Sequence, residues 1–172
     1  MTTIDKTDFF HDTLENKASI IHAGEGESFN INGIAFTFKV TSEMSNGQLG
    51  VYTIALAPMA IGAKPHYHRF MDETFIVTKG LLTIQAGDNE QKVGPGTVVF
   101  VPRFTPHGFR NDTDEEVSLI MLFNPSQKRE NFFRGLAETL SEDKIDPEKY
   151  LKLYNKYDSF PVDTSNMLPV RK

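Results

Sequence analysis

The sequence predicts an all-β protein: a double-sheet jelly roll, that is, a double-stranded β-helix barrel, followed by two short C-terminal helices. Roughly ten short segments rich in β-branched and aromatic residues are separated by turn signals, as in jelly rolls. Strand and helix patterns do not alternate along the chain, which argues against a βαβ organisation. After residue 123 the apolar period changes to that of helices.

Length and composition favour a single domain. The chain has 172 residues, enough for one sizeable core, whereas two domains would be cramped. A net charge of −5 without clustered Lys and Arg argues against nucleic acid as a partner. The absence of cysteine excludes disulfides and thiolate sites. No signal peptide and no long apolar run are seen, so we expect a cytoplasmic protein that does not bind membranes.

Three parts are predicted: an arm over residues 1–18, a β-barrel domain over residues 19–124 and a helical extension over residues 125–172. The arm carries Phe9, Phe10 and Leu14 at helical spacing, so a short helix and an extended arm both remain open. We expect Phe9 and Phe10 to pack on the domain or on a second subunit, where the arm would cover a sheet edge. The prediction is therefore a homodimer.

The strands are predicted in chain order. Residues 20–21 indicate a short strand, and the neighbouring His22 is interpreted as structural. Residues 28–31 and 34–40 alternate across Asn32-Gly33, the strongest short-range signal for a hairpin. Residues 58–65 are expected to form an irregular crossing, and 97–101 a strand buried on both faces, because nearly all its residues are β-branched or aromatic. Further strands are expected at residues 50–56, 73–78, 81–86, 91–93 and 117–123.

Two helices are expected after residue 123. Asn124 is a candidate N-cap, with Pro125 at the first helical position and Gln127 closing a capping box. A second helix start lies at Asp146-Pro147. We expect both helices to cover an outer face of the barrel, the alternative being a lid over the cavity mouth. Their apolar faces are formed by Phe132, Phe133, Leu136 and Leu140, and by Tyr150, Leu151 and Tyr154.

Three of the five histidines fall between residues 62 and 111. His66 and His68 stand two residues apart, so on a strand both imidazoles face the same side. Glu73 follows five residues later, and His107 lies on a later segment. A histidine pair alone is more often structural than metal-binding. Three imidazoles and one carboxylate, however, form a ligand set suited to a divalent first-row metal.

The same window resembles the cupin family. The first family motif, G-x5-H-x-H-x3,4-E-x6-G, is matched from Gly62 to Gly80, except that three residues rather than five precede the first histidine. The second motif, G-x5-P-x-G-x2-H-x3-N, is matched from Gly96 to Asn111, with Phe104 where the family usually has glycine. The resemblance implies that one divalent transition metal (Fe, Mn, Ni, Co, Zn or Cu) is bound by His66, His68, Glu73 and His107.

The favoured function is a metal-dependent dioxygenase for a small enolisable or phenolic substrate. Four protein ligands on a six-coordinate metal leave two positions for a substrate oxygen and for dioxygen. The phenylalanine-rich and tyrosine-rich helices are similar to those of quercetinase-like single-domain cupins, which act on flavonols. Glu73 is the candidate catalytic base, although it could equally be a permanent ligand only. Apolar cavity walls are predicted at Tyr52, Phe75, Phe100, Phe109, Met121 and Phe123.

Two other functions stay open. A metal-dependent isomerase or epimerase of a sugar or a keto acid would need Lys, Arg or Asp inside the cavity, and Arg103, Arg110 and Lys64 lie near the motifs. A non-catalytic small-ligand-binding module is the third hypothesis. The lack of a DNA-binding segment argues against a self-contained regulator.

Overall fold

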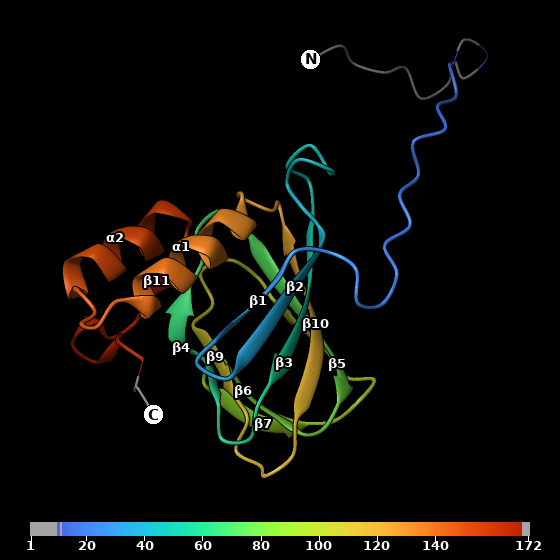
Figure 1. Ribbon diagram of the computed structural model, residues 1–172. Coiled ribbons are helices and arrows are strands. Elements are labelled where there is room, and N and C mark those ends of the chain that lie inside the picture. The colour runs from blue at the N-terminus through green and yellow to red at the C-terminus, as the bar shows by residue number, and fades with distance from the viewer. Residues whose placement is uncertain (1–9, 11, 170–172) are drawn as a thin grey trace.

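Two antiparallel sheets form the body of the protein in the computed structural model, which describes residues 10 and 12–169 (Figure 1). The first sheet has six strands and the second has five. In their order across the first sheet, the strands are β1 (Ser28–Ile31), β2 (Ile34–Val40), β3 (Gly50–Leu56), β10 (Val117–Asn124), β5 (Asp72–Lys79) and β8 (Val98–Val101). Those of the second are β11 (Phe160–Pro161), β4 (Ile61–Tyr67), β9 (His107–Arg110), β6 (Leu82–Ala86) and β7 (Asn89–Val93).

One core lies between the two sheets, because the strands bury every second side chain. On β3 this alternation buries Tyr52, Ile54 and Leu56, while Leu82 and Ile84 of β6 bring the second sheet into the same core. Two facing antiparallel sheets with two helices confirm the predicted all-β jelly roll. The predicted hairpin is also present, with Asn32 and Gly33 at φ 49° and 80° between β1 and β2.

Three strand predictions were wrong. Residues 20–21 form no strand, and β4 already begins at Ile61, within the expected irregular crossing. The strand β8 is not buried on both faces, since Val98 and Phe100 are 60% and 61% exposed. The reason is its position at the edge of the first sheet, where it pairs with β5 alone and turns one face to solvent.

The first helix, α1 (Arg129–Ser141), begins later than its sequence signals predicted. Asn124 ends β10 instead of capping the helix, and its side-chain amide donates a hydrogen bond to the carbonyl of Gln48. The second helix, α2 (Pro147–Lys156), begins as predicted, because Asp146 accepts hydrogen bonds from the two backbone amides that follow Pro147. A short 3-10 helix, η1 (Thr164–Asn166), follows β11.

The two helices close one side of the space between the sheets (Figure 1). Phe133 of α1 packs against Phe36, Phe38 and Tyr52, whose side chains point inward from the first sheet. The expected packing on an outer face is therefore wrong. The reason is that the amphipathic pattern shows which residues are buried but not which surface they meet. No helix in the described part of the chain is long and apolar enough to cross a membrane.

The described part of the N-terminal arm, residue 10 and residues 12–18, contains no helix and runs away from the sheets (Figure 1). Phe10 and Leu14 are 82% and 93% exposed, and Phe9 lies outside the described residues. We propose that the arm covers a sheet edge of a second copy of the chain. Deletion of residues 1–18 is expected to shift the protein from dimer to monomer in analytical ultracentrifugation. An unchanged mass would remove the arm from the interface.

Candidate metal centre

The structure brings together the four predicted ligands. His66 comes from β4, His68 follows that strand by one residue, Glu73 lies on β5 and His107 begins β9. One ligand atom of each side chain lies within 4.8 Å of those of the other three, and all four residues are buried. Pairing of β4 with β9 places His66 directly opposite His107, which explains how these segments, distant in sequence, meet.

Backbone carbonyls orient all three imidazoles. The Nδ1 atoms of His66 and His107 lie 2.9 Å from the carbonyl oxygens two residues before them, and Nδ1 of His68 lies 2.5 Å from the carbonyl oxygen of Asp158. A carbonyl only accepts hydrogen bonds, so each Nδ1 must carry the proton and donate. Each neutral ring therefore keeps a lone pair on Nε2, the atom available to a metal.

Glu73 contacts two of the three imidazoles, those of His68 and His107. Its Oε2 lies 3.0 Å from Nε2 of His68 and 2.8 Å from Nε2 of His107. When the imidazoles are neutral and carry their proton on Nδ1, the Nε2 atoms of His68 and His107 have lone pairs and no hydrogen. Oε2 of Glu73 then faces two other hydrogen-bond acceptors, and no donor lies between them. A divalent cation between them would satisfy all of these atoms at once. The donor set therefore fits a metal, with His66 as the third imidazole ligand.

The electrostatic environment favours the protonation states that a metal needs at His66, His68 and Glu73. Burial lowers the pKa of His66 well below its ordinary value, and the neighbouring imidazole of His107 adds to this effect. Burial also lowers the pKa of His68, although Glu73 opposes the shift. Burial alone would raise the pKa of Glu73, but hydrogen bonds from His107 and His68, donated when their Nε2 atoms carry protons, hold that pKa well below the usual range.

These shifts predict that the metal-free protein loses stability on mild acidification. Below about pH 6.5 His66 and His68 are protonated in the unfolded chain but not in the folded chain. The free energy of unfolding therefore decreases as the pH is lowered, by up to about 1.4 kcal/mol per pH unit for each imidazole. The low pKa of Glu73 extends the loss below about pH 4.5. Thermal melts of metal-free protein should show it, and a His66→Gln/His68→Gln variant should respond less. Equal slopes in the two proteins would contradict the assignment.

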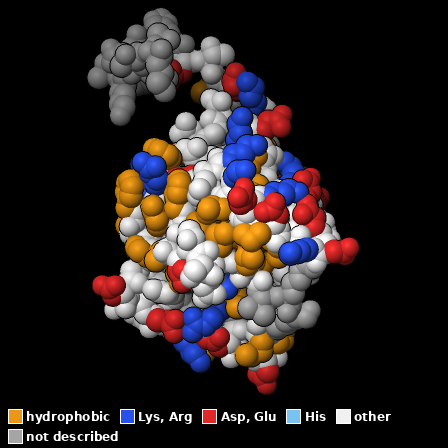
Figure 2. Space-filling view, turned by 90° about the vertical axis from the view of Figure 1, so that its left-hand side faces the viewer, with side chains coloured by type: hydrophobic (Ala, Val, Ile, Leu, Met, Phe, Trp, Pro, Cys, Tyr) orange, Lys and Arg blue, Asp and Glu red, His pale blue; other side chains and the backbone are white. Residues whose placement is uncertain are grey.

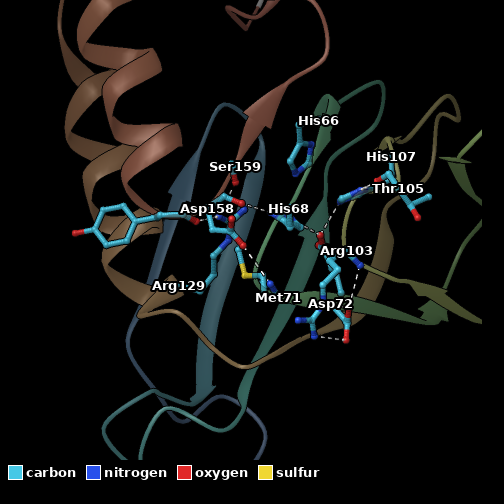
Figure 3. A network of polar contacts seen from close by, with 12 residues as sticks. His66, His68, Met71, Asp72, Arg103, Thr105, His107, Arg129, Asp158 and Ser159 are labelled. Carbon is cyan, nitrogen blue, oxygen red and sulfur yellow. Dashed lines mark hydrogen bonds and ion pairs between the residues drawn. The ribbon is translucent and has the colours of Figure 1, made fainter.

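Asp158, which the sequence did not single out, contacts the candidate metal site from the C-terminal extension (Figure 3). Its carboxylate accepts hydrogen bonds from the backbone amides of Arg69, Phe70 and Met71, at 2.8 to 3.1 Å. Its carbonyl accepts the hydrogen bond from His68. One buried residue therefore orients a ligand and shapes the loop between His68 and Glu73. Its φ of 60° suits a short polar residue following a helix.

Replacement of Asp158 with asparagine is expected to weaken metal binding by about ten- to a hundredfold, because the loop amides lose their charged acceptor. Asparagine tolerates the same backbone conformation, so the change isolates the carboxylate. Chelator competition measures the affinity. Asp163→Asn is the matched control, since Asp163 accepts hydrogen bonds from Ser165 on the exposed side of the same extension. Equal affinities for the two variants would show that the carboxylate does not support the centre.

The predicted cavity walls divide into two groups. Five side chains are at most 6% exposed and point into the space between the sheets: Tyr52, Phe75, Phe109, Met121 and Phe123. Two of these rings flank ligands, Phe75 at 6.2 Å from His107 and Phe123 at 5.9 Å from His68. The prediction that Phe100 lines the cavity was wrong, since Phe100 lies opposite Thr74 on the outer face of the first sheet.

Of the charged residues near the motifs, Arg103 and Arg110 lie at the surface, whereas Lys64 lines a cavity on the helical side. Arg103 pairs with Asp72 at 3.1 Å, Arg110 pairs with Glu90 at 2.8 Å, and Lys64 donates to the backbone carbonyl of Asn166. A different cation, Arg129 at the start of α1, is only 4% exposed. It was missed because the sequence assigned this residue to a helix on an outer face.

An apolar cavity of about 530 Å³ lies on the helical side of the molecule. Leu136 and Leu140 of α1, Tyr150 and Tyr154 of α2 and the first half of β4 line it. The ring of Tyr154, which lines the cavity, lies 6.5 Å from that of His66. Apolar side chains gather on this side of the surface (Figure 2).

Comparison with known proteins agrees with the motifs. Residues 52–123 match the family profile Cupin_2, described as a cupin domain. The chain is 26% identical over 123 residues to quercetin 2,3-dioxygenase of Bacillus subtilis (strain 168); the match covers 69% of this chain but only 34% of the dioxygenase.

Solved structures share the fold. KdgF from a Halomonas species aligns with a TM-score of 0.56 at 20% identity, over 63% of this chain and 94% of that one. A predicted oxalate decarboxylase from Thermotoga maritima aligns with a TM-score of 0.58 at 14% identity, over 62% and 99%. The family profile, the two-sheet fold and the positions of the motif residues agree, so residues 52–123 are similar to a cupin domain.

Proposed function

We propose that this protein is a metal-dependent dioxygenase that acts on a small enolisable or phenolic, flavonol-like substrate. The observation that carries the proposal is the buried group of three imidazoles and one carboxylate inside an aromatic interior. The match to a quercetin 2,3-dioxygenase supports the same reaction class, although this chain spans about a third of that protein's length. A bound divalent metal would supply Lewis-acid activation of the substrate oxygen and a site for dioxygen.

The residues of the chain itself would hold the metal and manage the substrate proton. His66, His68 and His107 present neutral Nε2 atoms, and Glu73 is ionised. We propose that Glu73 accepts the hydroxyl proton of the enol or phenol. Its low pKa makes it a weak base while it contacts the imidazoles, so proton transfer requires the carboxylate to turn away from them.

The apolar cavity on the helical side supports a planar substrate. A volume of about 530 Å³ is within the range of small-molecule sites, which are mostly apolar with few polar groups. Tyr154 lines this cavity beside His66, with a hydroxyl that accepts a hydrogen bond from Tyr150 at 2.7 Å. We propose that the substrate enters here, with a shift of the Tyr154 ring opening the path to the ligands.

Oxygen-electrode assays test the proposal. The protein is reconstituted anaerobically with iron, manganese, nickel or cobalt and then given a panel of flavonols and simpler enols. We expect at least one metal form to consume one dioxygen per substrate oxidised, and a His68→Ala variant treated identically to consume none. If no metal form consumes oxygen with any substrate, the dioxygenase assignment is wrong.

The second candidate is a metal-dependent isomerase or epimerase, and one observation favours it. Such an enzyme needs a charged group inside the cavity, and Arg129 is buried beside the cluster. Turnover of a keto acid or sugar without oxygen consumption would support it. Ligand binding without any turnover would instead indicate a non-catalytic binding module.

A further inference from the structure

Arg129, the first residue of α1, is a buried cation. Its guanidinium carbon lies 3.9 Å from the ring centre of Phe132, 4.8 Å from that of Phe123 and 5.3 Å from that of Phe133. Its Nη1 donates hydrogen bonds to the carbonyl of Tyr157 at 3.1 Å and to Oγ of Ser159 at 2.8 Å. The aromatic rings and these two bonds fix the orientation of the guanidinium group.

One edge of this guanidinium has no partner among the described residues. Both Nη1 hydrogens are used, and the hydrogen bonds found for Arg129 all come from Nη1, whereas the buried Nε donates none. Nε–H and one Nη2–H point in parallel, and this edge of arginine binds the two oxygens of a carboxylate. The unused donors are therefore those suited to a planar pair of anionic oxygens.

Nearby carboxylates are engaged elsewhere. Glu130 accepts hydrogen bonds from Ser42 and from the hydroxyl of Tyr52, and Asp158 accepts those of three backbone amides. None of the ion pairs found among the described residues includes Arg129. A buried charge without a paired counter-ion is costly, and burial accordingly lowers the pKa of Arg129.

Arg129 also lies next to the metal centre (Figure 3). The ring of Phe123 contacts its guanidinium on one side and lies 5.9 Å from the ring of His68 on the other. The two residues that accept its hydrogen bonds flank Asp158, the partner of His68. Its charge acts on Glu73, His66 and His68. A divalent metal would bring two positive charges to the interior, and Arg129 brings a third, whereas Glu73 supplies only one negative charge. The interior would therefore favour an anionic ligand.

We propose that Arg129 binds the carboxylate, or the adjacent anionic oxygens, of the ligand that reaches the metal centre. The inference rests on the proposed role of this interior as a ligand site, but not on oxygen chemistry. It narrows the ligand to a planar organic anion such as an aromatic or α-keto carboxylate. Arg129 would thus set the specificity of the site.

Calorimetric titration of zinc-loaded protein with benzoate and with benzamide tests this role. The two compounds share their shape, but only benzoate carries a charged oxygen pair. Wild-type protein is expected to bind benzoate at least about tenfold more tightly than benzamide. Arg129→Met should lower benzoate affinity by about ten- to a hundredfold, with benzamide affinity and zinc content unchanged. A merely structural role would move both ligands together.

Arg134→Met is the matched control, because Arg134 lies on the same helix but is exposed and paired with Glu27. It should bind benzoate like wild type. If Arg129→Met does not melt cooperatively, Arg129→Lys replaces it, and the loss of the parallel donors should still lower benzoate affinity several-fold.

The proposal is overturned if wild type binds no benzoate, binds both ligands equally, or binds benzoate equally well without Arg129. Because zinc is redox-inert, this result is independent of oxygen uptake. If benzoate binding depends on Arg129 but no oxygen is consumed, the anion-binding role of Arg129 stands and the proposed dioxygenase activity is wrong.

Discussion

Replacement of Glu73 with glutamine is expected to lower oxygen uptake by about a hundred- to ten-thousandfold while part of the metal is retained. Glutamine keeps the size and one oxygen donor, so His66, His68 and His107 can still hold a metal. Its amide is neither charged nor basic, and it cannot take the substrate proton. Its NH₂ group can also donate to the imidazole Nε2 atoms that now face Oε2, which competes with the metal.

Oxygen uptake and metal content are measured on the same samples, so that lost catalysis is distinguished from lost metal. Glu116→Gln is the control, because Glu116 is half exposed and pairs with Lys79 at 3.2 Å. Uptake within about threefold of wild type at equal metal content would leave Glu73 a ligand only. An isomerase would lose an oxygen-independent turnover in the same variant, and a binding module would show no turnover in either form.

Replacement of His68 with alanine is expected to lower metal affinity by more than about a hundredfold, since loss of a ligand should exceed the ten- to hundredfold effect of its supporting residues. The variant should still melt cooperatively, because an apolar core that includes Tyr52, Leu56 and Leu119 holds the two sheets together without the metal. Alanine also leaves the carbonyl of Asp158 without its donor. A modest decrease in melting temperature is therefore expected.

Chelator competition with zinc and with cobalt measures this affinity, and thermal melts of metal-free protein measure the fold. His22→Ala is the matched control, since His22 is exposed and lies outside both motifs. If His68→Ala keeps one equivalent of metal at the chelator concentration that wild type withstands, His68 is not a ligand.

The metal cluster could be predicted from sequence because its geometry follows from strand periodicity and motif spacing. Two histidines two residues apart must share a face of a strand, and the second motif places His107 opposite His66. The hairpin at Asn32-Gly33 was predictable for a similar local reason. The same reasoning gave a wrong prediction for Phe100. A continuous run of apolar residues indicates a strand buried on both faces, whereas β8 lies at the edge of its sheet with one face in solvent.

The supporting residues could not be predicted, since they act across long sequence separations. Asp158 contacts His68 from a position 90 residues away, and Arg129 reaches the interior only because α1 packs between the sheets. Local signals even misplaced the start of α1, where Asn124 belongs to the preceding strand. A helical pattern reveals an apolar face but not the polar residues that tertiary packing then carries inside.

The central claim, that three imidazoles and one carboxylate hold a single divalent metal, is tested most directly by elemental analysis. The protein is stripped of metal, reconstituted anaerobically with iron, manganese, nickel and cobalt in turn, and dialysed. We expect at least one of these metals to remain at close to one equivalent per chain in wild type, and none in a variant with His66, His68 and His107 all replaced by alanine. Wild-type protein that retains none of the four metals would contradict the account.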